Sequence, residues 1–371
     1  MRVHGAGRRL GRAAAYAAVV LLFFELASRA LLSSEAFFLR VASSRTEPSW
    51  RLQWVKRHRQ LAGALRFGVD IPHPTRGWAL RPGLRDSAGP GGKPVSSNSR
   101  GLRGRREYAI PKPVGVKRLL FLGDSFTFGE GVGDAETFCH RLQGLLPAVE
   151  VLNLGVHGYG HDQMLVTLRE EGPRYQPDVV ALGYVTDDAL RNLMRFRDSA
   201  KPRFELRDGR LLLTGVPVPT PSQILAAEPY RSKFLDLLTM LKQQADWRSG
   251  RRPQEMLDLT RAILDEFFAT ARGLGAQPVV IDLPVWRELE NQHTAPAPRE
   301  QFLADHCRRR EIPYLSLRPR FVHHRQQGGR LETQEHWGPG EHALAAEGIA
   351  DFLNQRGFLR SEASRDPAAG L

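Results

Sequence analysis

Cysteine and lysine are both scarce in this sequence of 371 residues. Two cysteines, Cys139 and Cys307, are too few for a disulfide scaffold or a four-thiolate zinc site. The pattern favours two buried free thiols over a single bridge in an oxidising compartment. Only seven of the 53 basic residues are lysines, so the net charge of +13 comes mainly from arginines. These arginines are scattered and no nucleic-acid-binding motif accompanies them, so a nucleic-acid partner is not expected.

The overall amino-acid composition shows no strong bias. A hydrophobic fraction of 42% with 25% charged residues is typical of a folded globular protein and excludes wholesale disorder or a coiled coil. The glycine-rich segment 123–133 lacks the Lys-Ser/Thr ending of a P-loop, so nucleotide binding is not expected. His157, His161 and Asp162 are interpreted as polar loop residues and not as a metal pair. No cofactor and no metal are therefore predicted.

The sequence contains one long apolar run, near its N-terminus. Arg8, Arg9 and Arg12 precede residues 13–32, and about 20 apolar residues are enough to cross a bilayer as a helix. The basic flank, residues 1–12, is predicted to stay in the cytoplasm, which places the rest of the chain outside. A cleaved signal peptide remains the alternative, because the uninterrupted apolar core covers only residues 13–24.

The composition and the hydrophobic pattern of the chain change at residue 117. Residues 45–115 are rich in arginine, proline and glycine and predict an irregular lead-in with one or two short strands. A hairpin around Asp208-Gly209 is predicted in an insertion at 197–223. Beyond residue 117, predicted strands alternate with predicted helices. The strands are expected at 118–123, 149–153, 179–183, 278–283 and 312–315, and the helices at 135–146, 161–171, 254–274, 299–310 and 340–355.

This alternation predicts an α/β domain over residues 116–358, with a parallel sheet between two layers of helices, followed by a flexible tail at 359–371. Four polar segments follow strands or precede the last helix: residues 123–125 (Gly-Asp-Ser), 153–160, 186–188 and 335–339. Ligands bind such sheets beyond the carboxyl ends of the strands, so the four segments are expected to converge there. Ser125, at a strand-to-helix turn, is a candidate nucleophile; the alternative for an isolated serine in this place is a helix N-cap.

The segment Gly123-Asp124-Ser125-Phe126-Thr127-Phe128-Gly129-Glu130-Gly131-Val132, with Ser97-Asn98-Ser99-Arg100-Gly101-Leu102-Arg103 before it, resembles the SGNH/GDSL hydrolase family and in particular its membrane-anchored bacterial branch. The resemblance extends from about Lys117 to Leu353. It implies a three-layer flavodoxin-like fold, with Ser125 as nucleophile and His336 as general base. Gly158 would match the glycine whose N–H joins that of Ser125 in the oxyanion hole.

Two positions depart from the family pattern. Asp187 stands where the family places an oxyanion-hole asparagine (Thr186 if the register slips by one), and a carboxylate there would repel an oxyanion. Asn192 or Thr186 is a possible substitute. If the cleft is that of a degraded enzyme, Asp187→Asn is expected to raise esterase activity and to leave binding unchanged.

The second departure concerns the acid that orients the histidine. Gln334 and Thr333 occupy the positions where the family carries it. Glu335 and Glu332 are nearby carboxylates that could take this role, while Gln334 could fix the tautomer of His336 without supplying charge.

The resemblance implies a serine-dependent esterase or acyltransferase acting on acyl groups, most simply acetyl, of a small molecule or an exported glycan. It also implies a bacterial inner-membrane location, with residues 13–32 in the membrane and the domain in the periplasm. The basic surface would suit an anionic glycan. The alternative is a catalytically impaired domain that uses the same cleft to bind glycan or a cell-envelope partner, which the altered positions at Asp187 and Gln334 favour.

Overall fold

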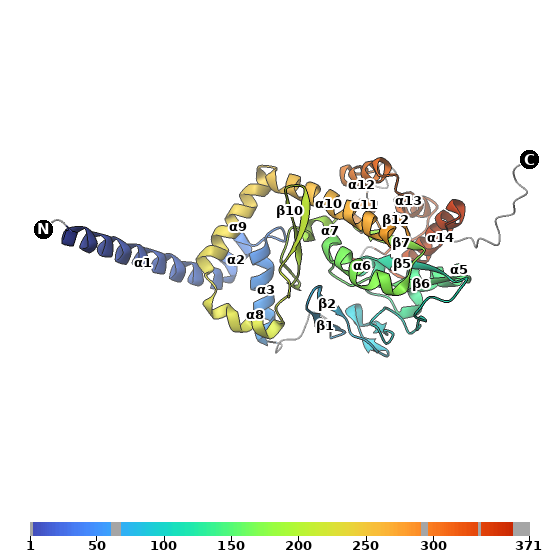
Figure 1. Ribbon diagram of the computed structural model, residues 1–371, viewed down its shortest axis with the longest axis horizontal. Helices are drawn as coiled ribbons and strands as arrows, with labels where there is room; N and C mark the ends of the chain where they lie inside the picture. Colours follow the sequence, from blue (N-terminus) through green and yellow to red (C-terminus); the bar gives the residue numbers. More distant parts are fainter. Residues whose placement is uncertain (1–2, 61–67, 291–295, 333–334, 359–371) are drawn as a thin grey trace, which may run out of the picture. The chain divides into compact units, whose positions relative to one another are not determined.

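A computed structural model describes residues 3–60, 68–290, 296–332 and 335–358 (Figure 1). The chain divides into two units. The first contains Met1–Gly63, Phe196–Asp198 and Pro221–Glu255, and the second contains Ala64–Arg195, Ser199–Thr220 and Met256–Leu371. Gln334 and the tail 359–371 lie outside the described residues.

The second unit is built around a parallel sheet of five strands in the order β13-β12-β7-β5-β6. Its strands are β5 (Lys117–Leu122), β6 (Val149–Asn153), β7 (Val179–Tyr184), β12 (Gln277–Asp282) and β13 (Tyr314–Ser316). The order is that of a flavodoxin-like sheet, in which the chain reverses direction across the sheet beside the first strand. The predicted fold class is confirmed.

Alternate residues of the central strands face opposite layers. Leu119 and Phe121 of β5 belong to a buried cluster that also includes residues of α5 (Phe138–Leu145) and α14 (Pro339–Arg356). Leu120 and Leu122, equally buried, face the other layer, where α6 (His161–Tyr175) packs against β5. The remaining helices of this unit are α4 (Ser125–Phe128), α7 (Asp188–Arg191), α11 (Trp286–Leu289), α12 (Pro298–Arg309) and α13 (Arg318–Gln326), with α10 (Arg251–Gly273) beginning in the first unit.

The lead-in is more ordered than the sequence indicates. Residues 68–115 form two short antiparallel pairs, β1 (Asp70–His73) with β2 (Gly77–Leu80) and β3 (Ser87–Ala88) with β4 (Pro94–Val95). These pairs belong to the second unit, and Trp78 donates a hydrogen bond to the carbonyl of His157 at 3.0 Å. The prediction of an irregular segment is wrong for residues 47–60, which form the helix α3 (Glu47–Gln60).

The predicted hairpin is confirmed as β10 (Arg203–Arg207) and β11 (Arg210–Thr214). Asp208 and Gly209 both have positive φ, at 49° and 73°, as a two-residue turn between twisted strands requires. Cys139 and Cys307 are both buried and free, as the sequence favours.

The first unit consists mainly of helices (Figure 1). They are α1 (Val3–Ser33), α2 (Glu35–Val41), α3, α8 (Pro221–Ala227) and α9 (Lys233–Arg248). Within α1, Arg9–Ser33 is long and apolar enough to cross a membrane by length and composition. The helices α8 and α9 are not anticipated in the sequence analysis.

Candidate active site

Ser125 lies where β5 passes into the short helix α4. Asp124 caps this helix: its Oδ1 accepts a hydrogen bond from the backbone N–H of Phe126 at 3.0 Å. Gly129 ends it in the left-handed region, at φ 83°, and its N–H donates to the carbonyl of Ser125. The turn also needs glycine at Gly123, because a Cβ there would lie 2.0 Å from the hydroxyl oxygen of Thr127. The local sequence Gly-Asp-Ser therefore determines the conformation of this turn.

The structure brings Ser125 and His336 together across 211 positions of the chain. Nε2 of His336 lies 2.8 Å from Oγ of Ser125, which is hydrogen-bonding distance. Ser125 is almost fully buried, and the side chain of His336 is 24% exposed. The imidazole packs on Phe126 with 5.2 Å between ring centres. This geometry lets the imidazole accept the serine proton.

Trp337 fixes the segment that carries His336. Its indole N–H donates to the carbonyl of Pro284 at 3.0 Å, and its ring contacts those of Phe126 and Phe321 at 5.2 and 5.0 Å. Trp337 is 5% exposed, so these contacts form part of the core under the histidine.

The candidates for the orienting acid are less well placed. Gln334 lies outside the described residues. Glu335 is exposed, and the Glu332 carboxylate lies beside Gly338, where an added Cβ would meet it at 2.2 Å. Within the described part of the chain, no carboxylate hydrogen-bonds to Nδ1 of His336. The structure therefore leaves the third member of the predicted triad unassigned.

Gly158 lies in the loop that follows β6, with φ 75°, a conformation that favours glycine. The loop is tied to the serine turn by Asn153, whose amide donates to the carbonyl of Thr127 at 2.8 Å and accepts from the N–H of Gly155 at 2.9 Å. Gly155 itself admits no side chain, because a Cβ would lie 2.4 Å from the backbone nitrogen of Phe128. The predicted convergence of the first two loops is confirmed.

Asp187 and Asn192 are engaged elsewhere. The Asp187 side chain is 45% exposed and forms ion pairs with Arg287 and, at 3.9 Å, with Arg299. Asn192 is fully buried, and its amide NH₂ lies 3.0 Å from the hydroxyl of Thr260 and 3.2 Å from Nδ1 of His161. The suggestion that Asn192 supplies the missing oxyanion donor does not fit, because its donors are already used.

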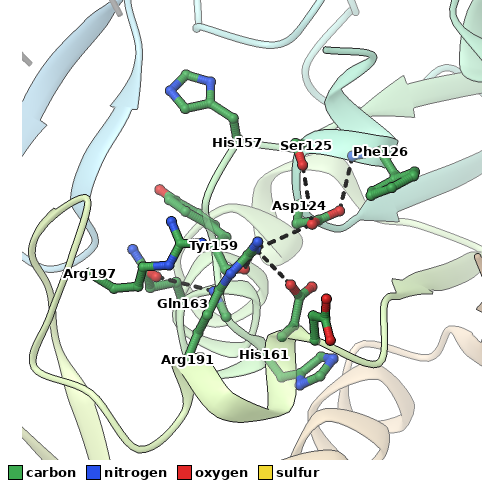
Figure 2. A network of polar contacts seen from close by, with 12 residues as sticks. Asp124, Ser125, Phe126, His157, Tyr159, His161, Gln163, Arg191 and Arg197 are labelled. Carbon is green, nitrogen blue, oxygen red and sulfur yellow. Dashed lines mark hydrogen bonds and ion pairs between the residues drawn. The ribbon is translucent and has the colours of Figure 1, made fainter. Parts of the chain in front are cut away.

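Arg191 is a further residue of the site, and no motif in the sequence singles it out. One nitrogen of its guanidinium, Nη1, contacts Asp124 Oδ2 at 3.2 Å, Asp188 Oδ1 at 2.6 Å and the carbonyl of Tyr159 at 2.7 Å. Figure 2 shows Arg191 reaching both the Asp124–Ser125 turn and the Tyr159 loop. Both carboxylates are buried, and burial raises the pKa of Asp188 well above its usual range, opposed by the charge of Arg191. An acidic residue three positions before an arginine was the available signal.

A pocket of about 280 Å³ opens beside the histidine. Its lining includes His336, Trp337 and three glutamates, Glu130, Glu332 and Glu335; we call it the acidic pocket. Oε2 of Glu130 lies 3.9 Å from Nε2 of His336. The chain carries a net charge of +13, yet the space next to its reactive pair is acidic.

The histidines near the site have other partners. His157 contacts the buried Asp70 at 2.5 Å, and His161 stacks on Tyr184 at 4.4 Å between ring centres. Burial lowers the pKa of His161 to about 3, so its ring is neutral at pH 7. Asp162 forms a fully buried ion pair with Lys201. Among the described residues, no three histidine, cysteine or acidic side chains are grouped to hold a metal.

Comparison with solved structures finds similarity at low identity over about two thirds of the chain. Similar solved structures include a member of the lipolytic protein G-D-S-L family from Veillonella parvula (12% identity, covering 64% of this chain and 99% of that chain, TM-score 0.40). They also include a catalytic mutant of an acetylxylan esterase from Geobacillus stearothermophilus (16%, 66% and 97%, 0.39). A third is an alpha/beta hydrolase enzyme from the metagenome of Lake Arreo, Spain (14%, 66% and 97%, 0.41).

No curated protein matches the sequence. The model of the GDSL-like Lipase/Acylhydrolase family matches residues 121–337, which is more than half of the chain and contains both Ser125 and His336. The chain therefore belongs to the GDSL-like lipase/acylhydrolase family of ester hydrolases.

Proposed function

We propose that this protein is a serine-dependent esterase or acyltransferase that cleaves acetyl or similar acyl esters of an exported glycan. The observation that carries the proposal is the 2.8 Å contact between Oγ of Ser125 and Nε2 of His336. Membership of a family of ester hydrolases supports the same reaction class.

In the proposed mechanism, Nε2 of His336 takes the hydroxyl proton while Oγ of Ser125 attacks the carbonyl carbon of the ester. The N–H groups of Ser125 and Gly158 donate to the oxyanion. When the tetrahedral intermediate collapses, His336 returns the proton to the leaving alcohol and the acyl group stays on Ser125. Water, or the hydroxyl of an acceptor in a transferase, then attacks the acyl-enzyme and gives its proton to His336. Ser125 regains that proton as the product acid or ester leaves.

Two roles rest on the resemblance to the family. Gln334 and Glu335 are the candidates to orient His336, and Asp187 stands at the position of the oxyanion asparagine. The ion pairs of Asp187 with Arg287 and Arg299 favour the second candidate function, a domain that binds an acylated glycan without turning it over. Such a domain would keep the cleft and lack one of the usual oxyanion donors.

The acidic pocket limits the charge that a bound substrate can carry. Three carboxylates beside His336 would repel an anionic group bound there, and they accept hydrogen bonds from sugar hydroxyls or from an ammonium group. We therefore infer that the sugar next to the scissile ester is uncharged or cationic. The expectation of an anionic glycan, which rests on net charge, is replaced at this position by a neutral one.

We also propose that residues 13–32 anchor the chain in the bacterial inner membrane, with residues 1–12 in the cytoplasm and the hydrolase domain, 116–358, in the periplasm. The length and apolar composition of Arg9–Ser33 and the arginines before it support this proposal.

The first test is labelling of the full-length protein in detergent with a fluorophosphonate probe, which reacts only with an activated serine. We expect labelling of the wild type and its loss in Ser125→Ala and in His336→Ala. The matched controls Ser44→Ala and His323→Ala, both at exposed positions, should label like the wild type. Folded wild-type protein that does not label would contradict the esterase and favour the binding function.

A labelled enzyme then allows the substrate to be tested. Acetyl release is compared between an acetylated neutral polysaccharide and an acetylated polyuronate, each at two salt concentrations. We expect faster release from the neutral polymer, with a preference that weakens as salt screens the carboxylates. Faster release from the polyuronate would contradict the role assigned to the acidic pocket.

A further inference from the structure

The first unit exposes a row of leucines on the helix α9. Leu235, Leu238 and Leu241 are 61%, 44% and 47% exposed, while Asp236 and Met240 of the same helix are buried. Residues three positions apart are neighbours on a helix surface, so the three leucines form a continuous apolar row. We propose that this leucine row lies in the interfacial layer of the same bilayer that α1 spans, so that the first unit binds the membrane at two places. The inference rests on the proposed membrane anchor and is independent of the proposed esterase activity.

The junction between α1 and α9 indicates the depth at which α9 begins. The Glu25 carboxylate accepts hydrogen bonds from the hydroxyl of Ser232 at 2.7 Å and from the backbone N–H groups of Lys233 and Phe234 at 3.0 and 3.1 Å. The rings of Phe24 and Phe234 stack with 5.2 Å between their centres. A glutamate inside an apolar helix needs such partners in a membrane, and here the first turn of α9 supplies them. The start of α9 is therefore level with residues 24 and 25 of α1.

The length of α1 before this junction is too short for a bilayer. The uninterrupted apolar run, residues 13–24, has 12 residues, which span about 18 Å as a helix. The hydrocarbon core of a bilayer is about 30 Å thick. If the arginines before residue 13 stay at the near boundary, the junction with α9 therefore lies inside the hydrocarbon, about 12 Å short of its far boundary. At that depth the neighbours of the leucine row are acyl chains and headgroups.

The surroundings of the leucine row fit the same environment. Leu26 and Leu31 continue the exposed apolar surface along α1 beyond the junction, at 57% and 42% exposure. Tyr230 precedes α9 and is 91% exposed, and the side chain of Lys242 is 68% exposed. Tyrosine and lysine at the edge of an apolar helix face are typical of segments that lie at a membrane surface.

The turn that carries Tyr230 is fixed to α1. Arg29 donates hydrogen bonds to the carbonyls of Pro229 at 3.3 Å and Arg231 at 3.1 Å, on either side of Tyr230. Because the exposed apolar surface is continuous with α1, lipid fits it better than a second copy of the chain or another protein.

The two native cysteines are buried, which allows site-specific labelling of the full-length protein. An environment-sensitive fluorophore is attached to Leu238→Cys, and the protein is reconstituted into vesicles containing lipids brominated along their acyl chains. Leu22→Cys in α1 reports on the anchor, and Val114→Cys, a fully exposed position in the second unit, is the matched control. Unmodified protein measures background labelling.

We expect quenching at positions 22 and 238 to be at least about threefold stronger than at position 114, as for an interfacial helix. Quenching at 22 with none at 238 would overturn this inference and leave the anchor intact. Quenching at neither would overturn the anchor and the inference together. A blue-shifted fluorophore at 238 that brominated lipid does not quench would mean that protein covers the leucine row, and this too would overturn the inference. Leu241→Cys repeats the measurement if Leu238→Cys does not fold.

Discussion

The two sides of the Ser125–His336 pair are held in different ways. Ser125 follows the central strand β5, and its turn is fixed by Asp124, by Arg191 and by the amide of Asn153, the last residue of the neighbouring strand β6. His336 precedes α14 and is positioned mainly through its neighbour Trp337. The serine side is held by several polar contacts, whereas the histidine side is held mainly by Trp337, together with the packing of His336 on Phe126 and the hydrogen bond from Gly338 to Glu341.

The two halves of the site should therefore respond differently to substitution. The contacts on the serine side are buried and polar. Removing Arg191, the cation that Asp124 and Asp188 share, would leave buried charges unpaired and lower the free energy of unfolding. The histidine side contains fewer polar contacts, so a change there should cost less stability and affect the rate more.

Arg191→Leu should have the largest effect, because it leaves the buried carboxylates of Asp124 and Asp188 without their cation. We expect a loss of about 3 kcal/mol in the free energy of unfolding, measured by urea unfolding of the detergent-solubilised protein. Arg287→Leu is the matched control, since it breaks an exposed pair with Asp187 and should cost less than about 1 kcal/mol. Equal losses in the two variants would contradict a special role for Arg191.

Asp282→Asn tests whether the buried carboxyl at the end of β12 is protonated in the folded protein. Burial raises the pKa of Asp282 to about 8, against a smaller lowering by the Tyr314 hydroxyl, which donates to it at 2.8 Å. Between about pH 4 and 8 the folded protein holds a proton that the unfolded chain lacks. The free energy of unfolding therefore falls as the pH rises through this range, and this carboxyl causes no further fall above about pH 8.

The asparagine variant carries no such proton. The advantage of the wild type over Asp282→Asn should therefore fall by about 1 kcal/mol per pH unit between pH 5 and 7. Unfolding free energies measured at pH 5, 6 and 7 check this slope, with the exposed Asp86→Asn as control. A difference between wild type and Asp282→Asn that does not change with pH would contradict a protonated Asp282.

Trp337→Phe removes the indole hydrogen bond to Pro284 and keeps an aromatic ring. We expect a loss of about 1 kcal/mol in unfolding free energy and a fall of about tenfold in kcat with little change in KM. Trp286→Phe, at a partly buried tryptophan of α11, is the control and should leave kcat unchanged. If Trp337→Phe raised KM alone, Trp337 would be a substrate contact and not a positioning residue.

The same contrast explains what could be predicted from the sequence. The serine turn is encoded locally: a buried strand, Gly-Asp-Ser and a glycine with positive φ follow one another within 13 residues, from Lys117 to Gly129. The sheet was predictable because strands buried on both faces are continuous apolar runs. Arg191 was not, since its role depends on carboxylates 67 and three positions away. The helix α9 was missed because its exposed leucines obscure the usual division into apolar and polar faces.

Asp187→Asn should have the smallest effect. If the residue lay in the oxyanion hole, replacing the carboxylate by an amide would raise the rate, because removing or adding one such donor changes kcat by about 10²–10³. In the structure the carboxylate is half-exposed and paired with Arg287 and Arg299, and exposed pairs contribute little. We therefore expect fluorophosphonate labelling and esterase rates within about threefold of the wild type. Arg287→Gln, which removes the nearer of the two arginines paired with Asp187, should change them as little. A rise of tenfold or more in Asp187→Asn would show that this side chain turns toward the oxyanion during the reaction, and that the wild-type serine side lacks an oxyanion donor at this position.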